Sequence, residues 1–352
     1  MNALTETPMR TRDESKVAEV ISEILTQRGH LFELRVSQWS GRARLTEDDL
    51  GLSGLTQNDL HRLGHMQLVP KQELAAISAI ATRARVRIGE VSYQFPLGGA
   101  RFVPAPVLGS LMADLNRIRA DFTNAVAAFG LKYETVAELH RGAWRESARK
   151  LAAERKLSAE WLAEFETRLA ENYPPQEEVV EAFSMSWAMF NLALPKGLRA
   201  QLVQSEEALE AARLADEARR AVEAQVAGFV SEAALELRRR AGDLCAHVAK
   251  QVTESGEKVS ERSLQPLRDL IAQFRNLDFT GDEAFAVELE RFAATHLTTG
   301  TAKSARESAD YRASLTTALN AMSERATGES KAASAAALDR FLKFGREGRA
   351  VE

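Results

Sequence analysis

The sequence predicts a mainly α-helical protein, in which a small N-terminal α/β head with a short antiparallel sheet precedes long antiparallel helices. Three observations predict this class. Most of the 20 glycines and nine prolines precede Gly197, and the rest of the chain is rich in Ala, Glu, Arg and Leu. Apolar residues recur every three or four positions over long stretches. A period of two is confined to short segments near the N-terminus.

The head begins after an N-terminal tail and an amphipathic helix expected from Glu14 to Arg28, which Gly29 ends. From Leu31 the apolar residues alternate with polar ones, which is typical of a half-buried strand, and Trp39 and Gly41 close it. A near-repeat follows, in which Thr46 and Thr56 each precede acidic or amide residues between leucines. We expect both threonines to cap helix N-termini, because an acid in the first turn complements the helix dipole.

The remainder of the head is expected to be one helix and two strands. Pro70 opens a helix that runs to about Ile88. Strands are expected over residues 91–95 and 101–103, with a tight turn at residues 96–99 between them. Together with the strand that begins at Leu31, they would form the small sheet.

The helical arm is expected from Pro106 onward as an extended bundle or a coiled-coil-like arm. A first helix would run to about Arg155, with Gly130 and Gly142 as places for a bend. Further helices are expected from Ser158, over residues 179–190, and over residues 198–252, where apolar positions advance by about 3.75 residues, a period that favours nearly straight antiparallel packing. Shorter helices are expected near residues 263–276, 281–297, 304–325 and 330–345. The expected domains are 1–29, 30–105, 106–256 and 257–352.

Composition limits the classes of function. The net charge is −4, so the whole chain presents no strong field toward nucleic acid or an anionic membrane. The single cysteine, Cys245, lies in an apolar helical stripe, which favours a small core residue and excludes an internal disulfide framework. No apolar run approaches the length of a membrane span, and the N-terminus lacks a signal-peptide apolar region. We therefore expect a cytoplasmic protein.

Catalytic and cofactor motifs are weak in this sequence. His61 and His65 have a spacing that lets two imidazoles share a metal, but no convincing third ligand accompanies them. Gly98 and Gly99 lack the Lys and Ser or Thr of a phosphate-binding loop, so a tight turn is the better interpretation. We expect no enzymatic activity, no metal and no cofactor.

Arginine clusters offer a second class of function, nucleic-acid binding, because several converging guanidinium groups can engage phosphates. The candidate residues are Arg83, Arg85, Arg87, Arg238, Arg239 and Arg240. Nearby acids, and aromatic residues that are not interleaved with the arginines, argue against this class. A self-assembling helical structural protein is a third class that the sequence leaves open.

Three segments carry a resemblance to a known family: Val36-Ser37-Gln38-Trp39-Ser40-Gly41-Arg42, Leu45-Thr46-Glu47-Asp48-Asp49-Leu50-Gly51-Leu52 and Phe95-Pro96-Leu97-Gly98-Gly99-Ala100-Arg101-Phe102-Val103-Pro104. In their order and spacing they resemble the bacterial proteins grouped as domain of unknown function 3150, over about residues 30–110. That family has no assigned catalytic residues. Its members tend to be encoded beside a MoxR-type AAA+ ATPase and a von Willebrand A-type protein, which implies a component of an ATPase-driven remodelling system.

The leading hypothesis is therefore a non-enzymatic adaptor or scaffold that binds a protein partner. Its candidate partner-binding residues are Trp39, Gly41, Arg42, Arg101 and Phe102. Whether Trp39 lies in the core or at an interface stays open from the sequence, as do the client, the oligomeric state and the pairing of the long helices within or between chains.

Overall fold

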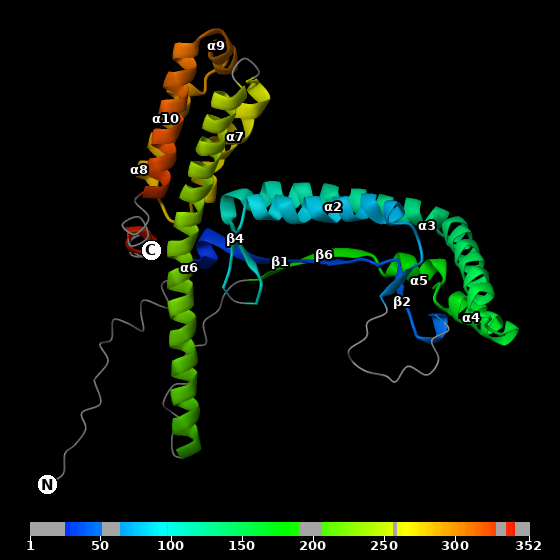
Figure 1. The fold of residues 1–352 in the computed structure, drawn as a ribbon. Coiled ribbons are helices and arrows are strands. Elements are labelled where there is room, and N and C mark those ends of the chain that lie inside the picture. The colour runs from blue at the N-terminus through cyan, green and yellow to red at the C-terminus, as the bar shows by residue number, and fades with distance from the viewer. Residues whose placement is uncertain are drawn as a thin grey trace. The chain divides into compact units, whose positions relative to one another are not determined.

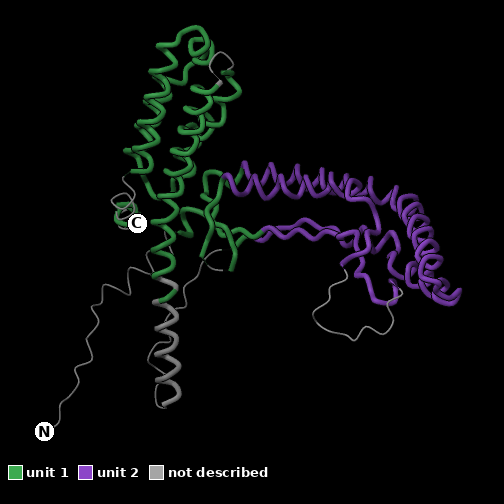
Figure 2. Tube along the Cα trace, viewed as in Figure 1, with its two compact units in different colours: residues 1–33, 91–109, 189–352 green, residues 34–90, 110–188 purple. Residues whose placement is uncertain are grey.

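The fold is taken from a computed structural model that describes residues 25–50, 64–96, 98–190, 206–255, 259–328 and 336–341. It is mainly α-helical with a short antiparallel sheet, as the sequence predicts (Figure 1). The chain divides into two compact units that interleave along the sequence (Figure 2). Unit 1 comprises residues 1–33, 91–109 and 189–352, and unit 2 comprises residues 34–90 and 110–188. The domains expected from the sequence are consecutive ranges.

The sheet of the predicted head is present, and its strand order is β4-β5-β1-β6. Strand β1 (Gly29–Ser37) pairs antiparallel with β5 (Arg101–Pro104), from Gly29 opposite Pro104 to Phe32 opposite Arg101. Strand β4 (Tyr93–Gln94) pairs antiparallel with β5. Gly98 and Gly99 both have positive φ, which confirms the tight turn before β5.

An aromatic core joins this sheet to the long helix α6 (Glu206–Ser255) in unit 1. The ring of Phe102 lies 5.6 Å from that of Phe229 and 4.6 Å from that of Phe279, centroid to centroid. The Tyr93 hydroxyl donates a buried hydrogen bond of 2.9 Å to the carbonyl of Leu277. Buried rings in tilted and edge-to-face contact stabilise a core beyond their area alone, so β4, β5 and α6 share one packed core within unit 1.

The C-terminal helices are α7 (Glu261–Leu277), α8 (Glu283–His296), α9 (Thr301–Glu307) and α10 (Ala309–Gly328). Figure 1 shows α10 running antiparallel along α6, with α7 beside them. The stripe predicted on α6 is buried at Val226, Phe229, Ala233, Leu237, Ala241, Val248 and Val252. The single helix expected over residues 304–325 is instead two, because the chain turns at Ser308 into extended backbone between α9 and α10.

Unit 2 is built on an antiparallel helix pair, α2 (Lys71–Glu90) and α3 (Ala105–Arg155). Ion pairs join Arg87 to Asp114, Arg83 to Asp121 and Glu73 to Lys132. The residue numbers of the partners fall along α2 as they rise along α3, so the two helices are antiparallel. Figure 1 shows α3 curving along its length as one continuous helix of 51 residues. Gly130 allows a close approach rather than a break, since a Cβ there would meet Val180 at 3.0 Å.

Shorter elements complete unit 2. Strands β2 (Arg42–Arg44) and β3 (His65–Gln67) form a second antiparallel sheet that the sequence did not predict. Thr46 and Asp49 exchange backbone-to-side-chain hydrogen bonds at the start of the 3-10 helix η1 (Asp48–Leu50), which supports the first predicted cap. The second predicted cap, Thr56, lies outside the described residues. Helix α4 (Ala159–Glu171) is capped by Ser158, as predicted.

The prediction of one aromatic helix over residues 179–190 is wrong. Helix α5 ends at residue 181 (Gln176–Glu181), and strand β6 (Ser184–Phe190) follows beside β1. Met185 is buried and Trp187 is half-buried, whereas Ser184, Ser186 and Ala188 are exposed. This alternation is that of a strand with one covered face. The spacing of Val179, Phe183 and Trp187 fits a helix equally well, which explains the error.

Candidate functional site

The five residues predicted to bind a partner are divided between the two units, with Arg101 and Phe102 in unit 1. Phe102 is 1% exposed and belongs to the aromatic core of unit 1. The Arg101 guanidinium donates to the Ser92 hydroxyl at 2.6 Å and to the Gln94 side chain at 3.1 Å. Burial first, and then the nearby Arg240 cation, lowers the pKa of Arg101. Both residues are therefore tied to the fold of unit 1.

The other three predicted residues belong to unit 2. Trp39 is half-buried, and its ring packs edge-on to Tyr133 at 5.7 Å and lies 6.3 Å from Phe129, centroid to centroid. Gly41 is buried with a φ of +66°, and a Cβ there would come within 2.9 Å of Val69. Arg42 is exposed on β2. Of these three, only Arg42 presents its side chain fully to solvent.

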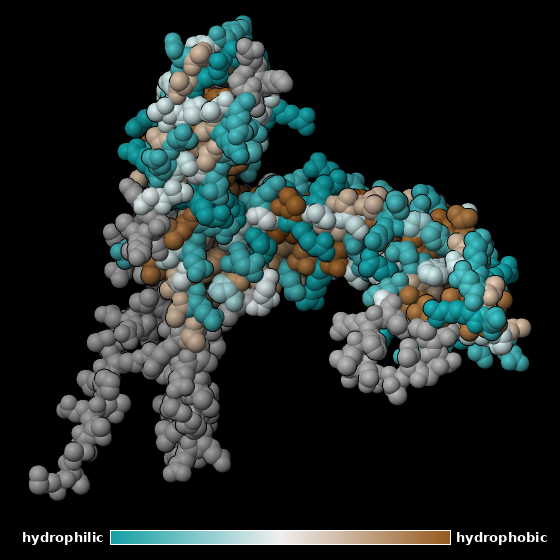
Figure 3. Space-filling model, in the orientation of Figure 1, coloured by the Kyte–Doolittle hydropathy of each residue, from teal (hydrophilic) through white to brown (hydrophobic). Residues whose placement is uncertain are grey.

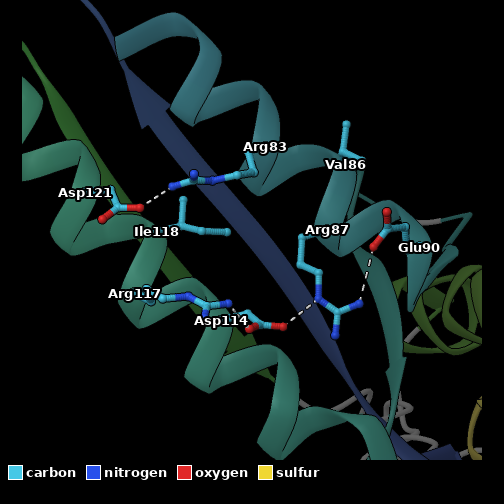
Figure 4. Close-up of a pocket in the computed structure, with 8 residues that line it drawn as sticks. All are labelled: Arg83, Val86, Arg87, Glu90, Asp114, Arg117, Ile118 and Asp121. Carbon is cyan, nitrogen blue, oxygen red and sulfur yellow. Dashed lines mark hydrogen bonds and ion pairs between the residues drawn. The ribbon is translucent and has the colours of Figure 1, made fainter. Parts of the chain in front are cut away.

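The first arginine cluster lines a cleft between α2 and α3 (Figure 4). Arg87 binds Asp114 at 2.7 Å, Arg117 binds the other oxygen of Asp114 at 2.7 Å, and Arg83 binds Asp121. The cleft measures about 390 Å³, and acids and cations alternate along its walls. Its charges are mutually compensated, so the cleft offers phosphate groups little net attraction. Arg85 is exposed on the same helix.

The second cluster has three different environments within three consecutive residues of α6. Arg238 forms a buried ion pair with Asp282, and its guanidinium also lies 4.7 Å from the ring centroid of Phe285. Arg239 is exposed and pairs with Asp243. Arg240 donates to Glu236 and to the backbone carbonyl of Ser92. Each arginine therefore has an acid of its own chain as its partner.

The described residues hold neither a metal centre nor a membrane span. In that part of the chain, no three His, Cys, Asp or Glu side chains gather in a way that could hold a metal ion. His65 lies exposed on β3, and His61 is outside the described residues. The helices searched include none that is both long and apolar enough to cross a membrane.

The surface that stands out is a stripe on α3, which we call the α3 stripe and define as Ala128, Leu131, Thr135, Leu139 and Gly142. Steps of three and four residues place these positions along one side of a helix. All five are exposed, Leu131 by 86% and Leu139 by 72%. The stripe spans about 21 Å at 1.5 Å per residue and carries no charge. Figure 3 shows brown, hydrophobic residues interrupting the hydrophilic surface over α2 and α3.

The opposite side of α3 fills the core of unit 2 through Phe122, Phe129 and Tyr133, which fixes the direction of the stripe. Leu139 also lies beyond the part of α3 that α2 accompanies. The last ion pair between the helices joins Lys132 to Glu73, two residues after α2 begins at Lys71. Beyond that point α2 no longer lies alongside α3, so Leu139 is left uncovered by it.

A ladder of ion pairs borders the α3 stripe along one side. Arg141 binds Glu134 at 3.4 Å and Glu138 at 3.1 Å, and Arg145 binds Glu138 at 2.9 Å. Charges of both signs flanking an uncharged stripe resemble the polar rim around the apolar centre of a protein interface.

The α3 stripe was not predicted from the sequence, because the apolar periodicity of this segment follows the buried positions of α3. Leu131 and Leu139 depart from that apolar periodicity, since Phe129 and Tyr133 occupy the inward positions beside them. Large apolar residues outside the buried phase of an otherwise amphipathic helix are the signal that could have found the stripe.

The comparisons with known proteins agree with the resemblance seen in the sequence. No curated protein and no solved structure matches the chain. A family model described as a protein of unknown function, DUF3150, matches residues 26–290, which is more than half of the 352 residues, and the chain therefore belongs to that family.

Proposed function

We propose that this protein is a non-enzymatic helical adaptor that binds a protein partner along the α3 stripe. The observation that carries the proposal is the exposure of Leu131 and Leu139 on one uncharged side of a helix whose other side is packed. Exposed leucines are ordinary when they are scattered singly. Here the two lie eight positions apart, with only exposed, uncharged Thr135 between them on the stripe.

The physical basis of binding would be burial of these side chains. Removing a leucine side chain from water contributes about 1.5–3 kcal/mol, and two on one rigid helix can anchor a partner helix laid along it. Helical recognition commonly uses anchors at steps of three, four and seven residues. The stripe offers positions at those steps, and α3 requires no ordering on binding because its opposite side is already packed.

The partner that the family resemblance favours is a MoxR-type AAA+ ATPase, with a von Willebrand A-type protein as a further component. A cytoplasmic location suits such a partner and suits the reduced, buried Cys245. Under this proposal the adaptor would bind the ATPase and present to it either a client protein or the adaptor itself as the substrate for remodelling.

Affinity purification of the tagged protein from its native host, with mass spectrometry, tests the proposal. We expect the wild-type chain to recover the ATPase with or without nuclease treatment, and the double variant Leu131→Glu, Leu139→Glu to lose it. Val287→Glu is the matched control, because Val287 is also an exposed apolar helical residue, at 39%, but lies on α8 in unit 1.

Two outcomes would contradict the proposal. Equal recovery of the partner by the wild type and the double variant would remove the α3 stripe from the binding site. Recovery of nuclease-sensitive material alone, at low salt, would favour the nucleic-acid alternative, because phosphate contacts weaken steeply as salt rises.

A further inference from the structure

Strand β6 lies at one edge of the sheet, with β1 as its only neighbour among the described strands. Figure 1 shows β6 running along β1. The strand is seven residues long, Ser-Met-Ser-Trp-Ala-Met-Phe, and contains no charged residue and no proline. Exposed residues dominate it: Ser184, Ser186, Ala188, Met189 and Phe190, with Met189 at 48% and Phe190 at 43%.

An edge of this kind is unusual for a folded protein. The outer side of an edge strand carries backbone N–H and C=O groups that can pair with another strand, and proteins commonly protect it with lysine, proline, a bulge or a very short strand. At the opposite edge of the sheet, β4 has only two residues. Strand β6 is seven residues long and carries neither lysine nor proline.

The strand is also held in place by its covered side. Met185 is 7% exposed and lines a small cavity with Phe122 and Val126 of α3. The guanidinium carbon of Arg119 lies 4.6 Å from the ring centroid of Trp187. Packing therefore fixes the extended conformation before any partner arrives, which lowers the entropy lost on pairing.

We propose that β6 pairs antiparallel with β6 of a second copy of this chain, about a two-fold axis at Trp187. Such a pairing places Trp187 opposite its counterpart, Ser186 opposite Ala188, and Met185 opposite Met189. Opposed residues in an antiparallel pair project to the same side of the sheet, so large side chains meet at the central and the 185/189 positions and small ones at 186/188, while Ser184 meets Phe190 at the ends.

Three features of β6 favour a second copy over another partner. Because the strand is uncharged, no like charges oppose each other across the axis, which would otherwise be a cost of self-pairing. In this register Trp187 faces Trp187, Met185 faces Met189 and Ser186 faces Ala188, and Ser184 faces Phe190 only at the two ends of the pairing. Closed two-fold dimers are also the commonest assembly of identical chains. The result would be one sheet continuous through both protomers.

Sedimentation equilibrium of the purified full chain over a range of concentrations tests the pairing. We expect the wild type to be dimeric. The variant Ser186→Lys, Ala188→Lys should be monomeric, because each lysine would face a lysine of the other copy. The variant Ser186→Glu, Ala188→Glu should be monomeric for the same reason. Mixing the two variants should restore a dimer through opposite charges.

The control is the variant Leu131→Glu, Leu139→Glu, which should remain dimeric, so failure of the adaptor proposal and failure of this one are distinguishable. A wild type that is monomeric at every concentration would overturn the pairing, as would a dimer that persists in both charged variants. Loss of a different protein from the native-host purification in the β6 variants, with the purified chain monomeric, would assign the edge to a strand of that protein instead.

Discussion

The Nε of Arg238 donates a hydrogen bond of 2.5 Å to a carboxylate oxygen of Asp282, and both side chains are almost completely buried. The next residue, Arg239, pairs with Asp243 at 2.9 Å in full exposure to solvent. The two neighbouring arginines therefore have different structural roles. Arg238 links α6 to the start of α8, whereas Arg239 lies on the solvated surface of α6.

Replacing Arg238 should destabilise the protein far more than replacing Arg239. Arg238→Ala leaves the buried Asp282 with a poorer partner, Arg340 at 3.6 Å, and loss of one member of a buried pair costs about 3–5 kcal/mol. Arg239→Ala breaks an exposed pair within one helix and should cost less than about 0.5 kcal/mol. Urea unfolding of both variants measures the difference. Equal stabilities would contradict the assigned roles.

Glycine has opposite roles at two positions of α6. At Gly242 a Cβ would lie 3.1 Å from both Ala326 and Thr327 of α10, whereas at Gly228 it would meet no atom within 4 Å. Gly242→Val should therefore lower the free energy of unfolding by about 1–3 kcal/mol through overpacking. Gly228→Ala should raise it by up to about 1 kcal/mol through helix propensity. Thermal unfolding followed by circular dichroism compares the two, and a stabilising Gly242→Val would show that α10 packs elsewhere.

Local pattern was sufficient to predict most of the fold. The strand through Phe32, the tight turn at Gly98 and Gly99, and the buried stripe of α6 each depend on residues close together in sequence. Three of the four strands of the sheet were predicted as its members, because those strands carry clear alternation or turn signals. The arm was expected as long helices, and α3 and α6 have that form.

Where the local sequence fits more than one structure, contacts with distant parts of the chain select one of them. Trp187 fits both a helical and a strand spacing, and pairing with β1 selects the strand. Arg238 is buried in an ion pair with Asp282, 44 residues away, and this distant partner distinguishes it from the exposed Arg239. The candidate surface was missed for a similar reason, since Leu131 and Leu139 are as apolar as the residues that α3 buries, and only the packing of α3 shows that they are exposed.

Trp39 should contribute to stability even though part of its ring reaches solvent. Its contacts with Phe129 and Tyr133 connect the segment after β1 to α3 within unit 2. Trp39→Ala should lower the free energy of unfolding by about 3 kcal/mol, toward the lower end for aromatic deletions. Trp39→Phe should lower it much less, because the phenyl ring keeps most of the aromatic contact. Denaturant unfolding measures both. A loss below about 1 kcal/mol would return Trp39 to the candidates for partner binding.

Stability should fall at alkaline pH, in part through Cys245. Burial raises the pKa of its thiol from an ordinary 9.0 to about 12. Above pH 9 the thiol ionises in the unfolded protein but keeps its proton in the folded protein. Ionisation stabilises the unfolded state, so the free energy of unfolding declines as pH rises from 9 toward 12. Burial also raises the pKa of Tyr133 and Tyr173 to about 12, which adds to the decline above pH 10.

Urea midpoints of the wild type and of Cys245→Ala at pH 7, 9 and 10 separate the thiol from the tyrosines. The wild type should lose more stability between pH 9 and 10 than Cys245→Ala, although the variant should start lower because it leaves a small cavity. In the folded protein the thiol should resist a thiol-reactive dye near neutral pH, since the thiolate is the nucleophile. Rapid labelling without unfolding would show that Cys245 is accessible and would contradict the buried position on α6.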